Sequence, residues 1–198
     1  MTSGPPAVIL AGGKSVRMGF PKLKLSRNGV PVLRSMLETL AKTDWGAVAV
    51  VISDEELTEF LDQVVPGVKV IFNPQPELGM ISSLRLALDW QPDEERGLLA
   101  WPVDHPLVGR KTLEALRAKA DLDQIAVPVF EGLRGHPTWW GLAYWRDLRS
   151  LEAEEGARAV LWMEGVRVLE VETDDPMVLV NINDPAKAQR YNLKEFRT

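Results

Sequence analysis

The chain has 198 residues, of which 45% are hydrophobic and 26% charged, with a formal net charge of -5 and no cysteine. This length and composition predict one folded domain spanning residues 1–198. The absence of cysteine excludes disulfides and cysteine-ligated zinc, and two histidines are too few for a histidine-rich metal site. A net acidic chain argues against a general nucleic-acid binder. No apolar stretch matches a membrane span or a signal peptide, so we expect no membrane partner and a cytoplasmic location.

The first part of the chain combines a short apolar strand with a glycine-rich segment that carries only positive charges. Residues 8–10 predict a buried strand, and Gly12 and Gly13 end it where the backbone must turn or approach a ligand closely. No Asp or Glu precedes Glu38, and four cations follow the glycines: Lys14, Arg17, Lys22 and Lys24. This local positive field predicts a site for a phosphate-bearing small molecule, although an ordinary turn with solvated lysines is the alternative.

Two common phosphate-binding loops do not match this segment. A P-loop would need a glycine where Val8 stands, five residues before Gly13. A dinucleotide-binding turn would need Gly-x-Gly-x-x-Gly and an acidic residue about twenty positions further on. Here the glycines are adjacent and the first acidic residue, Glu38, falls on a predicted helix. Both of these interpretations fail.

Strands and helices are expected to alternate along the rest of the chain. A helix begins at Pro31, another spans residues 53–64, a third starts near Ser82, and later helices span 111–120 and begin at Pro185. Apolar runs predict strands at residues 47–52, 68–72, 97–101, 125–130, 166–171 and 177–180. Pro128 indicates that its strand lies at an edge or contains a bulge. This order predicts an α/β fold: three α/β/α layers around a mostly parallel, Rossmann-like sheet.

A single carboxylate, Asp104, follows the predicted strand at residues 97–101. Pro102 and Pro106 restrict the backbone around it, at the edge of the sheet where ligands bind in open α/β folds. Such a carboxylate could coordinate magnesium, which shares its oxygen ligands with substrate phosphates, or it could cap a helix near Arg110. Near the end of the chain, three further polar residues could complete the metal site or simply cap the last helix: Asn181, Asn183 and Asp184.

Residues Leu10 to Lys22 read Leu-Ala-Gly-Gly-x-Ser-x-Arg-Met-Gly-x-Pro-Lys, which resembles the signature loop of the MobA-like nucleotidyltransferases. That family includes the guanylyl- and cytidylyltransferases of molybdenum-cofactor synthesis, and sugar-phosphate nucleotidyltransferases carry a related loop. Further segments resemble the family in chain order: 79–84, 102–108, 135–137 and 156–158. The resemblance implies a single nucleotidyltransferase domain with a nucleotide-diphospho-sugar transferase-like fold.

The resemblance also implies roles for individual residues. Nucleotide binding is expected for nine of them: Leu10, Ala11, Gly12, Gly13, Lys14, Ser15, Gly79, Ser82 and Ser83. Arg17 and Lys22 would neutralise the phosphates and the leaving group, and Asp104 would bind Mg²⁺. Metal binding extends to Asn183 and Asp184, and acceptor binding is expected for Gly135, His136 and Pro137. Judged on the residues alone, the segment at Ser82 could equally be a capped core helix, and residues 131–140 a hairpin capped by tryptophans.

Together these assignments predict transfer of a nucleoside monophosphate from CTP or GTP to a phosphate-bearing acceptor, most simply molybdopterin, with release of pyrophosphate. Gly13, Asn181 and Asn183 agree with the guanylyl branch. Residues 102–108 and 156–158 agree with the cytidylyl branch, as do Gly135 to Pro137, so more of the chain favours CTP. The alternatives are a sugar-phosphate nucleotidyltransferase, a non-catalytic nucleotide-binding module of the same fold, and a nucleic-acid-binding protein.

Overall fold

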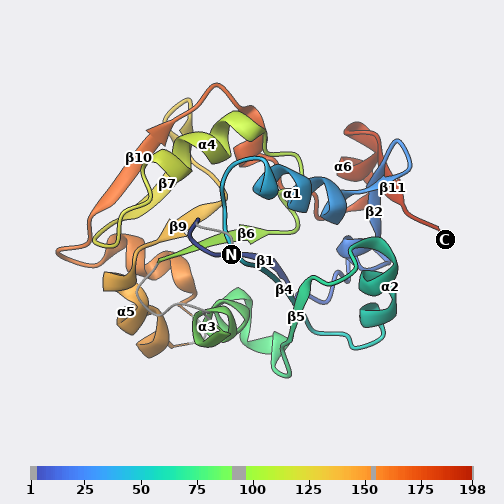
Figure 1. Ribbon diagram of the computed structural model, residues 1–198, viewed down its shortest axis with the longest axis horizontal. Coiled ribbons are helices and arrows are strands. Elements are labelled where there is room, and N and C mark those ends of the chain that lie inside the picture. Colours follow the sequence, from blue (N-terminus) through green and yellow to red (C-terminus); the bar gives the residue numbers. More distant parts are fainter. Residues whose placement is uncertain (1–3, 91–96, 153–154, 198) are drawn as a thin grey trace.

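The computed structural model describes residues 4–90, 97–152 and 155–197 (Figure 1). Its main sheet runs in the order β10-β7-β9-β6-β1-β4-β5, and the short β8 pairs with β7. The strands are β1 (Ala7–Ala11), β4 (Val48–Ile52), β5 (Lys69–Phe72), β6 (Leu98–Pro102), β7 (Ile125–Phe130), β8 (Leu133–Arg134), β9 (Thr138–Trp140) and β10 (Val168–Glu172). Among the described strands of this sheet, β8 and β9 run antiparallel and the others run parallel, so the predicted mostly parallel sheet is confirmed.

The helices lie on both faces of this sheet, which gives the three expected layers (Figure 1). They are α1 (Val32–Ala41), α2 (Leu57–Val64), α3 (Met80–Trp90), α4 (Arg110–Ala118), α5 (Trp145–Ser150) and α6 (Pro185–Arg190). Apolar residues of α1, α2 and α4 pack in one hydrophobic cluster, and those of α3 and α5 in another on the opposite face. Among the described residues, no helix is long and apolar enough to cross a membrane.

The central strands are buried on both faces because successive side chains point to opposite layers. In β1, Ile9 belongs to the cluster under α1 and α4, whereas Val8 and Leu10 belong to the cluster under α3 and α5. Register places Ile9 beside Val50 of β4 and Trp101 of β6. The continuous apolar runs of the sequence therefore correspond to the parallel core of the sheet.

A second, smaller sheet fixes the segment that follows the glycine-rich turn. It consists of β11 (Leu193–Glu195), β2 (Leu25–Arg27) and β3 (Val30–Pro31), in that order. A third hydrophobic cluster joins the same parts of the chain: Met18, Leu25, Val32, Ile182, Ala188 and Leu193. The C-terminal segment is therefore packed directly against the basic N-terminal segment.

The structure differs from the sequence prediction at Pro128. Its strand, β7, lies inside the sheet between β10 and β9, so the prediction of an edge position is wrong. Pairing of β7 with β9 ends at Ala126, and pairing with β8 begins at Val129. Pro128 thus occupies a break between two partners, where a missing backbone donor is tolerated.

Residues 177–180 were predicted as a strand, and this is also wrong. The chain forms a 3₁₀ helix there, η5 (Pro176–Leu179), and Asp175 accepts a hydrogen bond from Met177 N at its start. The other carboxylate oxygen of Asp175 accepts from Gly109 N at 2.7 Å and from Thr112 Oγ1 at 3.1 Å. One carboxylate therefore satisfies backbone donors at the starts of both η5 and α4.

We expect Asp175→Ala to destabilise the protein by about 2 kcal/mol, because it leaves several half-buried donors without a charged acceptor. Urea denaturation monitored by circular dichroism measures this change. The neighbouring Asp174 is exposed, and Asp174→Ala should stay within about 0.5 kcal/mol of the unaltered protein. Equal losses in the two variants would contradict the capping role of Asp175.

Candidate active site

The glycine-rich segment after β1 folds back on itself before it enters the small sheet. Ser15 has a positive φ of 49°, and its hydroxyl accepts a hydrogen bond from Lys22 N at 3.2 Å. Met18 is buried in the third hydrophobic cluster. A short 3₁₀ helix, η1 (Lys22–Lys24), follows. These contacts fix the backbone of Lys22 independently of its charged end.

The Lys22 side chain reaches Asp104, which lies just beyond the carboxyl end of β6. Its Nζ atom is 3.2 Å from Asp104 Oδ2, and the Asn181 amide donates to the same oxygen at 3.1 Å. The side chains of Lys22 and Asp104 are 16% and 24% exposed, so both remain accessible to a ligand. These two contacts could not be predicted from closeness in the sequence, because Lys22 lies 82 residues and Asn181 lies 77 residues from Asp104.

The backbone around Asp104 is held on three sides. Val103 N donates to Leu10 O at 3.0 Å, which ties the turn to β1. The Trp101 indole donates to His105 O at 2.9 Å, and Ile182 N donates to Asp104 O at 2.6 Å. The carboxylate is therefore positioned by the sheet and by the C-terminal segment.

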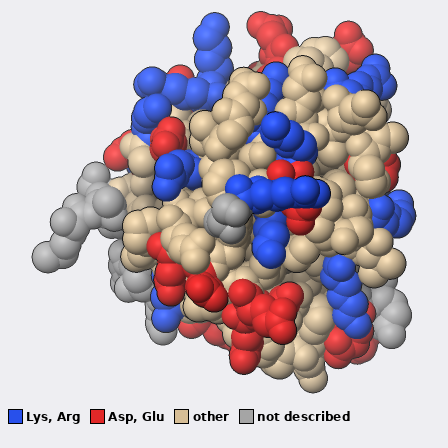
Figure 2. All heavy atoms as spheres, turned by 90° about the vertical axis from the view of Figure 1, so that its right-hand side faces the viewer, with Lys and Arg blue, Asp and Glu red and all other residues tan. Residues whose placement is uncertain are grey.

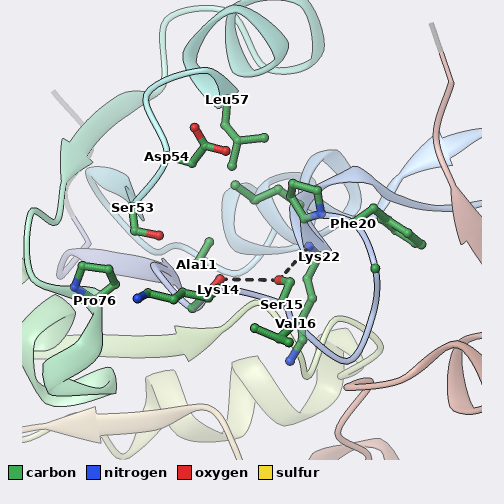
Figure 3. A pocket seen from close by; sticks show the side chains of 14 residues that line it. Ala11, Lys14, Ser15, Val16, Phe20, Lys22, Ser53, Asp54, Leu57 and Pro76 are labelled. Carbon is green, nitrogen blue, oxygen red and sulfur yellow. Dashed lines mark hydrogen bonds between the residues drawn. The ribbon is translucent and has the colours of Figure 1, made fainter.

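Two adjoining hollows open beside this contact. The larger, of about 430 Å³, is lined by the signature loop together with Ser53, Asp54, Leu57 and Pro76. Figure 3 shows the Ser53 and Asp54 side chains across this hollow from Lys14 and Ser15. The smaller, of about 170 Å³, extends from Gly12 and Gly79 to Asp104. Both are lined by Gly13, Ser15, Lys22 and Pro76, so a single elongated ligand could occupy them.

Basic side chains lie on one face of the protein and in the lining of the larger hollow. Figure 2 shows the face on which α2, α6 and β11 lie, with Lys and Arg side chains across its middle around a small group of acidic side chains. Lys14 and Lys22 both line the larger hollow. A site with fixed cations and free backbone N–H groups is suited to a polyphosphate.

The structure brings most of the predicted nucleotide-binding residues together. Those lining one or both hollows are Leu10, Ala11, Gly12, Gly13, Lys14, Ser15, Gly79 and Ser83. Ser82 is buried behind Ser83 and lines neither hollow. Arg17 is exposed and also lies outside both linings, so its predicted role as a phosphate ligand stays a prediction.

The remaining predicted residues lie outside the linings of both hollows. Asp184 caps α6 by accepting from Lys187 N at 2.8 Å, which is the structural alternative that the sequence left open, and its metal role stays a prediction. Asn181 rather than Asn183 contacts Asp104. The segment from Gly135 to Pro137 packs against η5, with His136 N donating to Val178 O, and is absent from the linings of both hollows.

Sequence reasoning missed three polar residues that follow the strands at the same edge. Ser53 and Asp54 come directly after β4 and line the larger hollow. Asn73 comes directly after β5 and is 1% exposed. The rule that identified Asp104, a polar residue just beyond a parallel strand, would have identified them as well.

The donor set at Asp104 consists of oxygens suited to a hard cation. Among the described residues there is no group of three or more His, Cys, Asp or Glu that could hold a metal ion. Within the described part of the chain, the Asn181 Oδ1 atom is buried without a hydrogen-bond partner, beside the Asp104 carboxylate to which its amide nitrogen donates. A carboxylate and an amide oxygen fit magnesium, provided that substrate phosphates supply further ligands.

Comparison with known proteins identifies the family. A family model described as "MobA-like NTP transferase domain" matches residues 7–168. The chain belongs to the MobA-like NTP transferase family. A curated relative from Rhizobium meliloti (strain 1021), the molybdenum cofactor guanylyltransferase, is 33% identical over 159 residues, which cover 78% of this chain and 72% of that protein. The family predicted from the signature loop is therefore confirmed, and with it the general class of nucleotidyltransferases.

Solved structures agree with this MobA-like assignment at the level of the fold. A nucleotidyl transferase from Methanothermobacter thermautotroptrophicus matches with a TM-score of 0.80 and 24% identity, covering 96% of each chain. A Mycobacterium tuberculosis H37Rv protein solved in complex with manganese matches with a TM-score of 0.74 and 20% identity, covering 96% of this chain and 98% of that one. The predicted nucleotide-diphospho-sugar transferase-like fold is confirmed.

Two histidines pack together behind the Asp104 carboxylate of this MobA-like site. The ring centroids of His105 and His136 are 4.7 Å apart, and both Nδ1 atoms are buried without a hydrogen-bond partner in the described chain. Burial lowers the pKa of His136 from 6.5 to about 4, with repulsion from His105 adding to the effect and Asp104 opposing it. Burial also lowers the pKa of His105, again against the attraction of Asp104. Both rings are therefore neutral near pH 7.

This shift predicts a loss of stability in mild acid. Between pH 6.5 and about 4 the unfolded chain binds a proton at residue 136 that the folded chain does not, so the free energy of unfolding falls as the pH falls. After allowance for partial exposure, His136 should contribute about 2 kcal/mol to the difference between pH 7.5 and pH 4.5. Urea denaturation at both pH values, with His136→Asn as the comparison, measures it. An identical pH dependence in the two proteins would contradict the buried neutral state.

Proposed function

We propose that this protein transfers a nucleoside monophosphate from CTP or GTP to a molybdopterin-type acceptor and releases pyrophosphate. The observation that carries the proposal is the contact of Lys22 and Asn181 with Asp104 at the junction of two hollows that the signature loop lines. The Lys22 ammonium at this point would contact a triphosphate directly, and the Asp104 carboxylate would act on it through a bound cation. The name and 33% identity of the curated relative support a molybdenum-cofactor acceptor.

In the proposed reaction an oxygen of the acceptor phosphate attacks the α-phosphorus, and the bond to the pyrophosphate leaving group breaks. The backbone N–H groups around Gly12 and Gly13 would bind the nucleotide, and Lys22 would stabilise negative charge on the phosphates. No side chain has to act as a strong base, because positioning and charge neutralisation supply most of the rate in phosphoryl transfer. Arg17 could approach the β- and γ-phosphates from the exposed side of the loop.

Magnesium is the proposed cofactor, held by Asp104 with Asn181, Asn183 or Asp184 nearby. When bound, the ion would supply positive charge to the triphosphate and the departing pyrophosphate. The oxygen donors at Asp104 and the manganese in the similar M. tuberculosis structure support a divalent cation. The metal ion would replace the Lys22 ammonium beside the Asp104 carboxylate, and the ammonium would then contact a phosphate of the nucleotide.

The base of the nucleotide is a choice between two candidates. The curated guanylyltransferase relative favours GTP, as do Gly13, Asn181 and Asn183. Resemblance to the cytidylyl branch favours CTP, and it covers residues 102–108, 135–137 and 156–158. CTP and GTP would make different contacts through their bases but the same contacts through their phosphates.

We expect Asp104→Asn and Lys22→Ala each to lower kcat/KM by about 10²–10³-fold, as removal of one preorganised charge does at other sites. Pyrophosphate release, measured against magnesium concentration, tests both variants. The exposed Asp62→Asn is a matched control on α2 and should keep the unaltered rate. Arg17→Ala is expected to cost less than Lys22→Ala, because Arg17 lies outside the hollows. An unchanged magnesium response in Asp104→Asn would place the metal elsewhere.

Thermal stabilisation identifies the nucleotide. We expect CTP or GTP with magnesium to raise the melting temperature more than ATP or UTP, because a ligand that binds only the folded state stabilises it by mass action. The same titration with Asp104→Asn is the control for a metal-dependent shift. Equal shifts with all four triphosphates would contradict base recognition, and the absence of any shift would contradict nucleotide binding.

A further inference from the structure

Three buried polar side chains lie next to the glycine-rich turn and are joined by hydrogen bonds: Asn73, Ser82 and Ser83. Asn73 joins the end of β5 to the loop before α3, and the two serines lie in the first turn of α3. Their exposures are 1%, 8% and 3%, so each polar atom must find its partner within the protein or in a ligand. The pattern of donors and acceptors can be worked out atom by atom.

The orientation of the Asn73 amide follows from its contact with the backbone. Gln75 N lies 2.9 Å from one end of the amide, and a backbone N–H can only donate, so that end is the oxygen Oδ1. The other end is therefore the NH₂ group. It lies 2.9 Å from Ser82 Oγ and 2.9 Å from Ser83 Oγ, and its two protons account for both contacts. Asn73 is thereby fully engaged and lines neither hollow.

The hydrogen-bonding capacity of the Ser82 hydroxyl is also used within the protein. Its hydroxyl lies 2.8 Å from Gly79 O and 3.1 Å from Gln75 O, and carbonyl oxygens can only accept. Ser82 therefore donates to the backbone while it accepts from Asn73. It has no proton left for a ligand, although the sequence placed it with the nucleotide-binding residues.

Ser83 differs from its neighbour in one respect that matters. Its hydroxyl oxygen accepts from Asn73, and no acceptor within the described part of the chain receives its proton. The side chain lines the smaller hollow together with Lys22 and Asp104. A hydroxyl has one proton and two lone pairs. The Asn73 NH₂ group donates to one lone pair, so the Ser83 proton points away from Asn73 and is available to an acceptor in the hollow.

The same hydroxyl is fixed from the side of the signature loop. A Cβ atom built on Gly12 would lie 2.5 Å from Ser83 Oγ and 3.4 Å from Asn73 Nδ2. Only glycine permits this approach, so the loop and the first turn of α3 hold the serine between them. At Gly13 a Cβ atom would meet nothing within 4 Å, so the close contact is specific to Gly12.

We propose that Asn73 is a positioning residue for nucleotide binding. By donating to Ser83 it sets the polarity of that hydroxyl, which then donates its proton to an acceptor oxygen of the nucleotide in the smaller hollow. The inference rests on the nucleotide-binding part of the proposed function, in which Ser83 is already expected to bind the nucleotide, and it adds a role for Asn73. Ser83 contacts the ligand, whereas Asn73 acts only through Ser83.

A double-mutant cycle on triphosphate affinity tests this inference. CTP and GTP are titrated, in magnesium, into the unaltered protein, Asn73→Ala, Ser83→Ala and the double variant, by calorimetry at a temperature where each is folded. Each single change should weaken binding of the preferred triphosphate by about three- to tenfold, the effect of one neutral hydrogen bond. The double variant should bind as weakly as Ser83→Ala and no more so, because Asn73 has no other route to the ligand.

Two further variants separate positioning from a loss of stability. Asn73→Asp keeps the shape but replaces the NH₂ donor by an acceptor, so the Ser83 proton turns toward residue 73; we expect affinity to fall at least as far as in Asn73→Ala. Thr43→Val removes another buried hydroxyl that donates only to backbone carbonyls, and should lower the melting temperature without changing affinity. Two results would overturn the inference. One is a loss of affinity in the double variant equal to the product of the losses in the two single variants, and the other is unaltered affinity in Ser83→Ala.

The cycle is read from binding alone, so its outcome is distinct from that of the proposed reaction. The expected affinities without pyrophosphate release from any acceptor would refute the transferase proposal and leave Asn73 in its role. Normal turnover with unaltered affinity in both single variants would refute the role of Asn73 and leave the transferase proposal intact.

Discussion

The contact between Lys22 and Asp104 is the interaction around which the site is arranged. It joins the signature loop to the turn after β6 across 82 residues of sequence, at 3.2 Å. Because both side chains keep access to water, the ion pair itself contributes no more than about 1 kcal/mol to stability. Its importance lies in placement, since one cation and one carboxylate meet at the junction of the two hollows.

Each partner of this contact is held by its own surroundings. Ser15 Oγ accepts from Lys22 N, Val103 N donates to Leu10 O, and Ile182 N donates to Asp104 O. Neither backbone depends on the ion pair for its position. The pair can therefore separate around a ligand without loss of the fold, which a phosphate-binding lysine and a metal-binding carboxylate both require.

The sequence predicted the layers and the signature loop because these follow from local rules. Apolar runs such as Val8 to Leu10 are buried wherever they occur in a parallel sheet, and glycines next to such a run permit a close approach. The strand predicted at residues 177–180 failed because Asp175 caps a 3₁₀ helix there, a contact that depends on α4 being close. The sequence offered Asn181 as one of three residues for the metal site but not its contact with Asp104, because that partner lies 77 residues away. Asn73 was not assigned to the site, although its partners Ser82 and Ser83 lie only 9 and 10 residues away.

The C-terminal segment shows why the site cannot be understood from its motifs alone. The match to the family model ends at residue 168, yet Asn181, whose side-chain amide contacts Asp104, lies beyond it. Ile182 and Leu193 share a hydrophobic cluster with Met18 of the signature loop, and β11 pairs with β2 immediately after that loop. Burial of these apolar side chains draws the two ends of the chain together, because each apolar surface covers the other. The sheet pairs β1 with β6 and so places Asp104 beside the loop, whereas this hydrophobic contact brings Asn181 of the C-terminal segment to the carboxylate.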